Sequence, residues 1–185
     1  MNAERNAKDA SISERMRAGK GSGILRHSKH VLHHLSKPTA LILCRDGTIT
    51  EDIVHFHRQF QAPGTPLQMY GIFGGISALA PNSPVCHYPP YAEGLFEELV
   101  MGCKRQGIEM IFCYDHCPCL MFQAAGIKEG SRRACELHTA GVEEVHRRTE
   151  GMTVISMQHF YDPRHTSGYS FEFLREKSLI LPRDD

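Results

Sequence analysis

Several features that define whole classes of protein are missing from this chain. No apolar run approaches the ~20 residues that a membrane-spanning helix requires, and the polar N-terminus lacks the apolar core of a secretory signal. Lys and Arg together number 21, as do Asp and Glu, so no excess of charge favours nucleic acid or an anionic membrane as a partner. We therefore expect a cytoplasmic protein with no nucleic-acid and no membrane partner.

The seven cysteines also lack the even number and regular spacing of a disulfide framework. In a reducing compartment, such cysteines are more often buried thiols or metal ligands than disulfides. Cys86, Cys103 and Cys135 are expected to be buried thiols. The other four, Cys44, Cys113, Cys117 and Cys119, lie at or near the expected ends of two strands.

The chain divides into a polar arm and one domain. Residues 1–22 have mixed charge and end in a glycine-rich stretch, so we expect a flexible N-terminal arm there. Residues 23–185 contain no internal repeat and no low-complexity linker. With 41% hydrophobic residues, a chain of 185 residues is long enough for one domain with its own core. We expect 23–185 to be that domain.

Short apolar runs alternate with amphipathic segments along this domain. The apolar runs predict strands over 39–44, 66–73, 108–113 and 153–162, with 169–174 paired to the last. Helical spacing predicts helices over 24–35, 50–60, 91–107, 119–126 and 130–149. Thr50 is the expected N-cap of the second helix and Gly107 the expected C-cap of the third. The alternation predicts an α/β fold, a central, mostly parallel β-sheet flanked by helices.

Two of the predicted strands end at residues that can bind a metal. Cys44 ends the first and Asp46 follows it, while His116 and Cys119 follow the third. Because the carboxyl ends of parallel strands meet in one crevice, these side chains can surround one point. Two thiolates and an imidazole suit tetrahedral zinc. Asp46 would be either a fourth ligand or an acceptor beside a metal-bound water, whose pKa zinc lowers towards ~7.

Other interpretations of the cysteine-rich stretch stay open. The ligands could be local, with Cys113 and Asp115 included, although Cys113 lies within a strand and is expected to face the core. Cys117 and Cys119 could be a redox pair, but one intervening residue is tight for an unstrained disulfide. A purely structural zinc, closed by four protein ligands, is a third possibility. The four histidines at 27, 30, 33 and 34 are expected to be solvated and not to form a second metal site.

The metal pattern and its surroundings resemble the β-class carbonic anhydrases. That family has Cys-x-Asp-x-Arg at the end of its first strand and His-x-x-Cys at the end of a later one; here CRDGT stands at 44–48 and HCPC at 116–119. The flanking stretches KPTALILC, APGTPLQMYGIFGG and YAEGLFEEL follow the family's order. The resemblance, over about 38–175, implies a carbonic-anhydrase-like fold and zinc held by Cys44, His116 and Cys119, with Asp46 binding in a closed state.

The arginine of the family motif is Thr48 in this chain. In the family that arginine pairs with the aspartate and holds it away from zinc, so the resemblance implies that Asp46 binds the metal more readily here. Arg45 is the neighbouring residue that could replace the missing arginine. Asp46 and Arg45 are therefore the predicted catalytic residues.

Three functions stand as hypotheses. The first is a zinc lyase in which zinc hydroxide attacks carbon dioxide to give bicarbonate, or attacks a related small electrophile such as carbonyl sulfide or carbon disulfide. The second is a zinc-bound but inactive relative with a binding or scaffold role, and the third is a thiol redox protein. The resemblance also implies a homodimer or a dimer of dimers, with the segment 24–35 packed on the partner.

Overall fold

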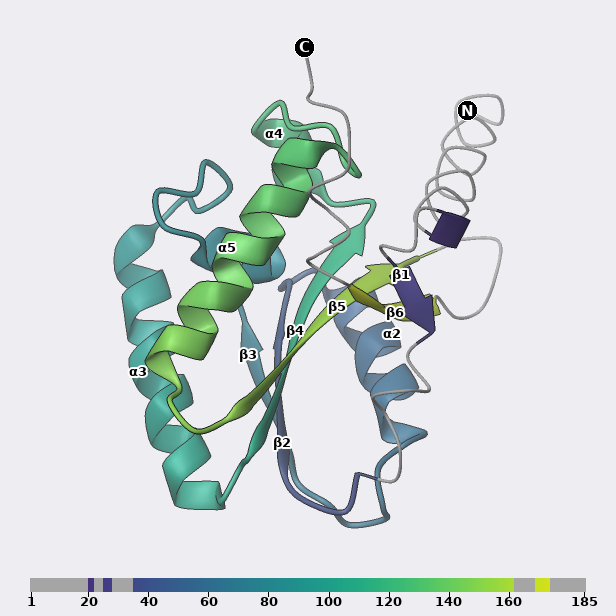
Figure 1. Cartoon of the computed structure of the whole chain (residues 1–185), viewed down its shortest axis with the longest axis vertical. Helices are drawn as coiled ribbons and strands as arrows, with labels where there is room; N and C mark the ends of the chain where they lie inside the picture. The colour runs from purple at the N-terminus through teal and green to yellow at the C-terminus, as the bar shows by residue number, and fades with distance from the viewer. Residues whose placement is uncertain (1–19, 22–24, 28–34, 162–168, 174–185) are drawn as a thin grey trace.

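A computed structural model describes residues 20–21, 25–27, 35–161 and 169–173 of the chain (Figure 1). Within these residues, six strands form one sheet in the order β1-β6-β5-β4-β2-β3. The strands are β1 (Leu25–His27), β2 (Thr39–Leu43), β3 (Leu67–Gly71), β4 (Met110–Cys117), β5 (Thr153–Phe160) and β6 (Tyr169–Phe173). Strands β3, β2, β4 and β5 run parallel, and β6 and β1 are antiparallel additions at one edge. The predicted α/β fold with a mostly parallel sheet is confirmed.

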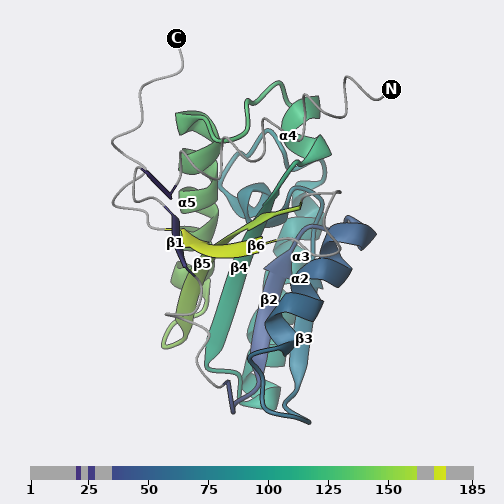
Figure 2. The ribbon, with the colours of Figure 1, turned by 90° about the vertical axis from the view of Figure 1, so that its right-hand side faces the viewer.

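Helices cover both faces of this sheet (Figure 2). They are α2 (Gly47–Arg58), α3 (Pro89–Gln106), α4 (Leu120–Ala124), α5 (Arg132–Arg148) and a short 3-10 helix, η2 (Gly75–Leu79). On one face of the sheet, α2 packs against the odd-numbered side chains of β2. On the opposite face, α3, α5 and η2 pack against the even-numbered side chains of β2. Figure 1 shows α4 beyond the arrowhead of β4, at the carboxyl ends of the parallel strands.

Strand β2 shows why the apolar runs of this sequence become central strands. All five of its residues are buried. Leu41 and Leu43 belong to the cluster under α2, and Ala40 and Ile42 to the cluster under α3 and α5. A strand covered on both faces needs an uninterrupted apolar run, because successive side chains point to opposite faces.

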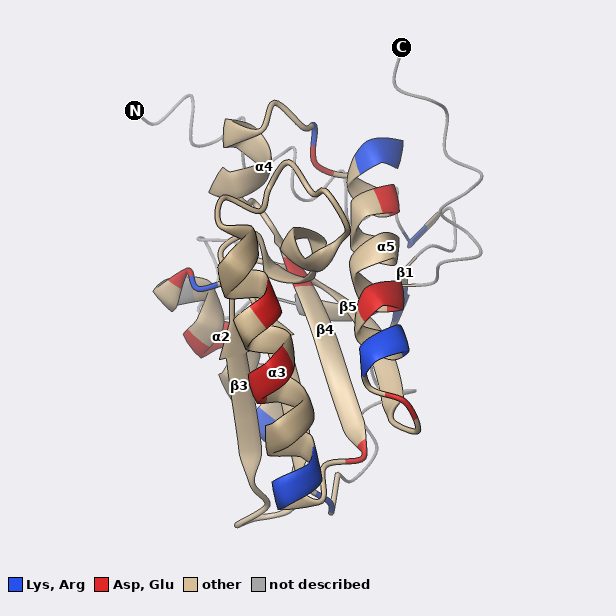
Figure 3. Ribbon diagram, turned by 90° about the vertical axis from the view of Figure 1, so that its left-hand side faces the viewer, with Lys and Arg blue, Asp and Glu red and all other residues tan. Residues whose placement is uncertain are grey.

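Charged residues of both signs share the exposed faces of α3 and α5 (Figure 3). Arg148 joins the two helices, with Nη1 2.7 Å from Glu93 Oε2. Its guanidinium also lies 4.5 Å from the centroid of the Phe96 ring.

Among the described residues, no helix is long and apolar enough to span a membrane.

The strands at 39–44, 66–73, 153–162 and 169–174 are confirmed to within a few residues, as is the helix at 91–107. Gly107 caps that helix in the left-handed conformation, with φ of 64°. The second helix begins earlier than predicted: Asp46, not Thr50, is its N-cap. Thr50 already lies inside the first turn and donates from Oγ1 to the Cys44 carbonyl at 2.8 Å.

Two strand predictions need larger corrections. Strand β4 continues to Cys117 instead of ending at Cys113, because β5 offers ladder partners as far as Phe160. Leu25–His27 is a strand paired with β6 and not the start of a helix, so tertiary pairing outweighs the helical spacing there. The rest of the predicted helix 24–35, apart from Leu35, and three of its four histidines lie outside the described residues.

The predicted arm also falls almost entirely outside the described residues. Only Lys20 and Gly21 belong to the described part, and the Lys20 ammonium lies 4.5 Å from the centroid of the Phe171 ring. The boundary between an arm at 1–22 and a domain at 23–185 therefore stays a prediction.

None of the seven cysteines, which all lie within the described residues, is in a disulfide bond. Cys103 and Cys135 are buried as expected, whereas Cys86 is only half-buried. Burial raises the pKa of the Cys103 thiol to about 11, so this cysteine behaves as an inert core residue.

Two helical glycines give a paired test of the packing. A Cβ on Gly141 of α5 would lie 2.1 Å from the Ile76 carbonyl oxygen of η2, whereas one on Gly94 of α3 would meet nothing within 4 Å. We expect Gly141→Ala to lower the free energy of unfolding by about 1–3 kcal/mol through overpacking. Gly94→Ala should raise it by about 0.5–1 kcal/mol. Urea unfolding of both variants measures this, and equal stability of the two would contradict the described packing of α5 on η2.

Candidate metal centre

Three potential metal ligands meet at the carboxyl ends of β2 and β4. Cys44 directly follows β2, His116 is the last but one residue of β4, and Cys119 is the N-cap of α4. One ligand atom from each lies within 4.8 Å of the other two. All three residues are buried, with at most 3% of their surface exposed. The convergence of two strand ends that the sequence predicts is thus present in the fold.

The hydrogen bonding of His116 fits a metal ligand. Both ring nitrogens are buried, and neither has a hydrogen-bond partner in the described part of the chain. Leaving a buried polar group unsatisfied costs ~1–3 kcal/mol. A cation bound beside the two sulfur atoms would use one of these nitrogen lone pairs. The donor set of two thiolates and one imidazole is one that binds transition metals.

The cluster favours one thiolate even without a metal. A hydrogen bond from the Cys119 thiol, aided by His116, holds the pKa of Cys44 well below its ordinary value despite burial. The same hydrogen bond raises the pKa of Cys119. Burial opposes charge on His116, but its proximity to the Cys44 sulfur raises the pKa of the imidazole overall. A metal must therefore displace protons from this site when it binds.

Glu129, which the sequence analysis did not identify, holds the loop that carries Cys119. Its carboxylate accepts a short hydrogen bond from the Cys119 backbone N–H. The Cys117 thiol donates to the other carboxylate oxygen at 3.1 Å. Cys117 is therefore directed towards Glu129, while Cys119 is directed towards Cys44. This arrangement gives no support to a Cys117–Cys119 redox pair.

Asp46 and Arg45 lie next to the cluster in sequence but occupy different environments. The Asp46 backbone helps to lower the pKa of the Cys44 thiol, yet the Asp46 carboxylate is not part of the set within 4.8 Å. The Arg45 guanidinium lies 5.8 Å from the ring centroids of Phe73 and of Tyr91. Asp46 as a fourth ligand and Arg45 as its partner both stay predictions. The Thr48 side chain lies outside what the structure describes.

The alternative of purely local ligands finds no support. Cys113 is fully buried in the core between the sheet and α3. The Asp115 carboxylate faces η2 and α5, where it accepts from the Ser77 backbone N–H at 3.2 Å and contacts His138. Alternation along β4 therefore points these two side chains away from His116.

Comparisons with known proteins leave the family open. No protein-family model matches the chain, and no curated protein matches it. Among solved structures, the fold is similar to a carbonic anhydrase from Streptococcus mutans, with a TM-score of 0.44 and 11% sequence identity over 88% of this chain and 96% of that one. A similarity this low does not decide the function.

Removal of a ligand is expected to abolish stoichiometric metal binding. Cys44→Ala or His116→Ala leaves only two of the three clustered donors, too few to retain a metal through dialysis. Cys103→Ala, which removes a buried thiol elsewhere in the core, should keep the metal content of the unmodified protein. Elemental analysis of dialysed, zinc-loaded protein measures this. Full zinc retention in both ligand variants would refute the assignment.

Metal affinity is expected to fall as the pH falls. Cysteine and histidine ligands bind only when deprotonated, so protons compete with the metal. The raised pKa of Cys119 means that this thiol holds its proton at neutral pH in the metal-free protein. Zinc addition should therefore release protons into an unbuffered solution. Binding with no proton release, or with affinity independent of pH, would contradict the described thiol pair.

Proposed function

We propose that the Cys44–His116–Cys119 cluster binds zinc and that the protein is a lyase of the carbonic-anhydrase type. Its substrate would be carbon dioxide, or a related small electrophile such as carbonyl sulfide or carbon disulfide. The observation that carries the proposal is the buried set of three ligands, two sulfur and one nitrogen, at the carboxyl edge of a parallel sheet. Catalytic zinc sites have three protein ligands and keep one position open, whereas structural sites are closed by four.

Zinc bound in this way would supply a hydroxide nucleophile at neutral pH by lowering the pKa of a water molecule. The residues of the chain would do the rest. Cys44, His116 and Cys119, all buried, would hold the zinc, and Glu129 keeps Cys119 in place by accepting a hydrogen bond from its backbone N–H. Asp46, directly after Cys44, is the group proposed to accept the proton or to close the fourth position.

The Thr48 position favours a second candidate, a zinc-bound protein with a binding or scaffold role. Arg45 is the adjacent cation, and its guanidinium lies over Phe73 and Tyr91. With no arginine at 48 to hold the Asp46 carboxylate away, the closed state would dominate. Turnover would then be slow or absent, although the zinc would still be bound.

We also propose that the protein acts as a homodimer or a dimer of dimers. Large apolar side chains are exposed beside the cluster: Phe73 and Tyr91 flank Arg45, Leu120 follows Cys119, and all three are between 41% and 70% exposed. The Tyr91 hydroxyl donates a hydrogen bond to the Gly71 carbonyl at 3.0 Å, which fixes this exposed side chain against the end of β3. Exposed apolar groups that gather at one end of a molecule are typical of a protein interface.

The proposed location is the cytoplasm, a reducing compartment that would keep the thiols available as ligands.

Carbon dioxide hydration by the unmodified protein is expected to be weak near neutral pH. Each ~1.36 kcal/mol that favours the aspartate-bound state leaves about tenfold less of the open form, so a bias of about 2–3 kcal/mol suppresses activity by roughly two orders of magnitude. Thr48→Arg should raise the rate by pairing with Asp46. Stopped-flow hydration assays with a pH indicator measure both rates.

The matched control is Gln59→Arg, which adds the same charge at an exposed position at the end of α2. It should leave the rate unchanged. Robust hydration by the unmodified protein would show that another residue replaces the arginine. A zinc-loaded Thr48→Arg protein without any gain in rate would favour the scaffold role.

A further inference from the structure

A second constellation of reactive side chains lies on the opposite face of β4 from His116. Asp115 of β4, His138 of α5 and Ser156 of β5 form one hydrogen-bonded chain. His138 Nδ1 lies 3.0 Å from Asp115 Oδ2, and His138 Nε2 lies 2.6 Å from Ser156 Oγ. Asp115 and His138 are buried, with 3% and 2% of their surface exposed. The proposed lyase chemistry does not use this chain.

The direction of these hydrogen bonds is decided by Asp115. A carboxylate only accepts, and this one also accepts from the backbone N–H and the hydroxyl of Ser77. The His138 Nδ1 therefore carries the proton that points at Asp115. In the neutral imidazole this leaves a lone pair on Nε2, so the Ser156 hydroxyl must donate to it. This is the order of groups that activates a serine nucleophile.

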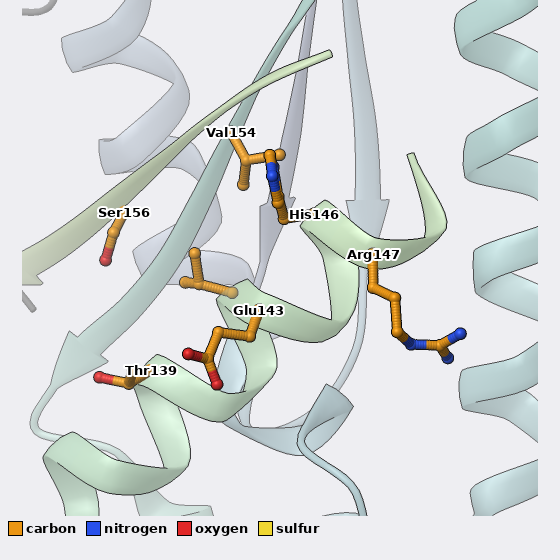
Figure 4. Close-up of a pocket in the computed structure, with 7 residues that line it drawn as sticks. Thr139, Glu143, His146, Arg147, Val154 and Ser156 are labelled. Carbon is orange, nitrogen blue, oxygen red and sulfur yellow. The ribbon is translucent and has the colours of Figure 1, made fainter. Parts of the chain in front are cut away.

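Ser156 also borders a hollow in the surface. The hollow has a volume of about 500 Å³ and lies between β5 and α5 (Figure 4). Val154 and Ser156 project from β5, and Thr139, Val142, Glu143, His146 and Arg147 from α5. The Thr139 Oγ1 is buried and has no hydrogen-bond partner in the described part of the chain. A small, uncharged ligand with an apolar end suits the two valines.

A similar chain elsewhere in the molecule shows why access matters. On the other face of β5, His159 Nε2 lies 2.9 Å from Asp52 Oδ2, and its Nδ1 lies 2.8 Å from Ser170 Oγ. Ser170 is only 3% exposed and His159 is fully buried. This second chain ties α2 to the adjacent strands β5 and β6. Ser156 differs from Ser170 because it reaches a hollow that a substrate can enter.

We propose that Ser156 is an activated nucleophile and that the hollow accepts short-chain, uncharged esters. The Ser156 oxygen bonds to the acyl carbon while its proton moves to His138 Nε2. The bond from the acyl carbon to the leaving oxygen then breaks, and His138 returns the proton to that oxygen. A water molecule then attacks the acyl carbon and gives its proton to His138 Nε2. The bond from the acyl carbon to the Ser156 oxygen breaks, the acid leaves, and His138 returns the proton to Ser156. Asp115 is a positioning residue, which holds the tautomer of His138.

The test uses the full chain, zinc-loaded and again after chelation, with diisopropyl fluorophosphate as the probe. The Ser156 oxygen should displace fluoride from phosphorus, and mass spectrometry of peptides should place the adduct on Ser156. Ser156→Ala should lose the adduct and any hydrolysis of p-nitrophenyl acetate that accompanies it. Ser170→Ala, the matched control from the second chain, should keep both. His138→Gln should slow labelling by about 10²-fold or more.

Asp115→Asn should slow labelling at a temperature where the variant is still folded and keeps its zinc, because an amide can stabilise the wrong tautomer of His138. A purely structural role for Asp115 would instead lower the thermal midpoint without a specific loss of labelling. The absence of an adduct on Ser156 in the folded, unmodified protein overturns the proposal. Loss of labelling on chelation would assign the reactivity to the metal centre and also overturns it. Neither outcome bears on carbon dioxide hydration.

Discussion

The parallel pairing of β2 with β4 is the constraint on which both the fold and the candidate metal centre depend. The two strands lie in the middle of the sheet, in register from Thr39 with Met110 to Ile42 with Cys113. Both are buried on their two faces, so a shift by one residue would exchange every side chain between the two apolar layers. The pairing that buries the core is therefore also the pairing that brings Cys44 to His116.

The carboxyl half of β4 concentrates polar groups where the sheet would otherwise be apolar. Asp115, His116 and Cys117 are all buried. Asp115 bonds to η2 and α5, and Cys117 bonds to Glu129. Only His116 among these three lacks a hydrogen-bond partner within the described chain. Because buried polar groups are nearly always satisfied, the exception marks the position where a ligand from outside the chain is expected.

Two Asp–His–Ser chains connect helices to opposite faces of the sheet. His138 joins α5 to Asp115 and Ser156 on one face, and His159 joins Asp52 of α2 to Ser170 on the other. Burial lowers the pKa of His159 although Asp52 opposes the shift, which keeps its imidazole neutral. The same set of residue types can thus be a structural tie on one face and a candidate nucleophile on the other. What separates them is whether the serine reaches solvent.

The sequence by itself determined the elements whose signals are local. The apolar run at 39–43 needs burial on both faces, and Gly107 is a residue that adopts a left-handed cap without strain. The proximity of Cys44 to His116 also followed from the sequence, because parallel strand ends share one edge of the sheet. Tertiary structure alone decided the length of β4, which depends on how far β5 continues beside it, and the strand at Leu25–His27, which depends on β6. It also decided the partners of Glu129, Asp115, His138 and Ser156. These residues come from separate elements, and no spacing along the chain encodes a hydrogen bond that forms only when two distant surfaces pack together.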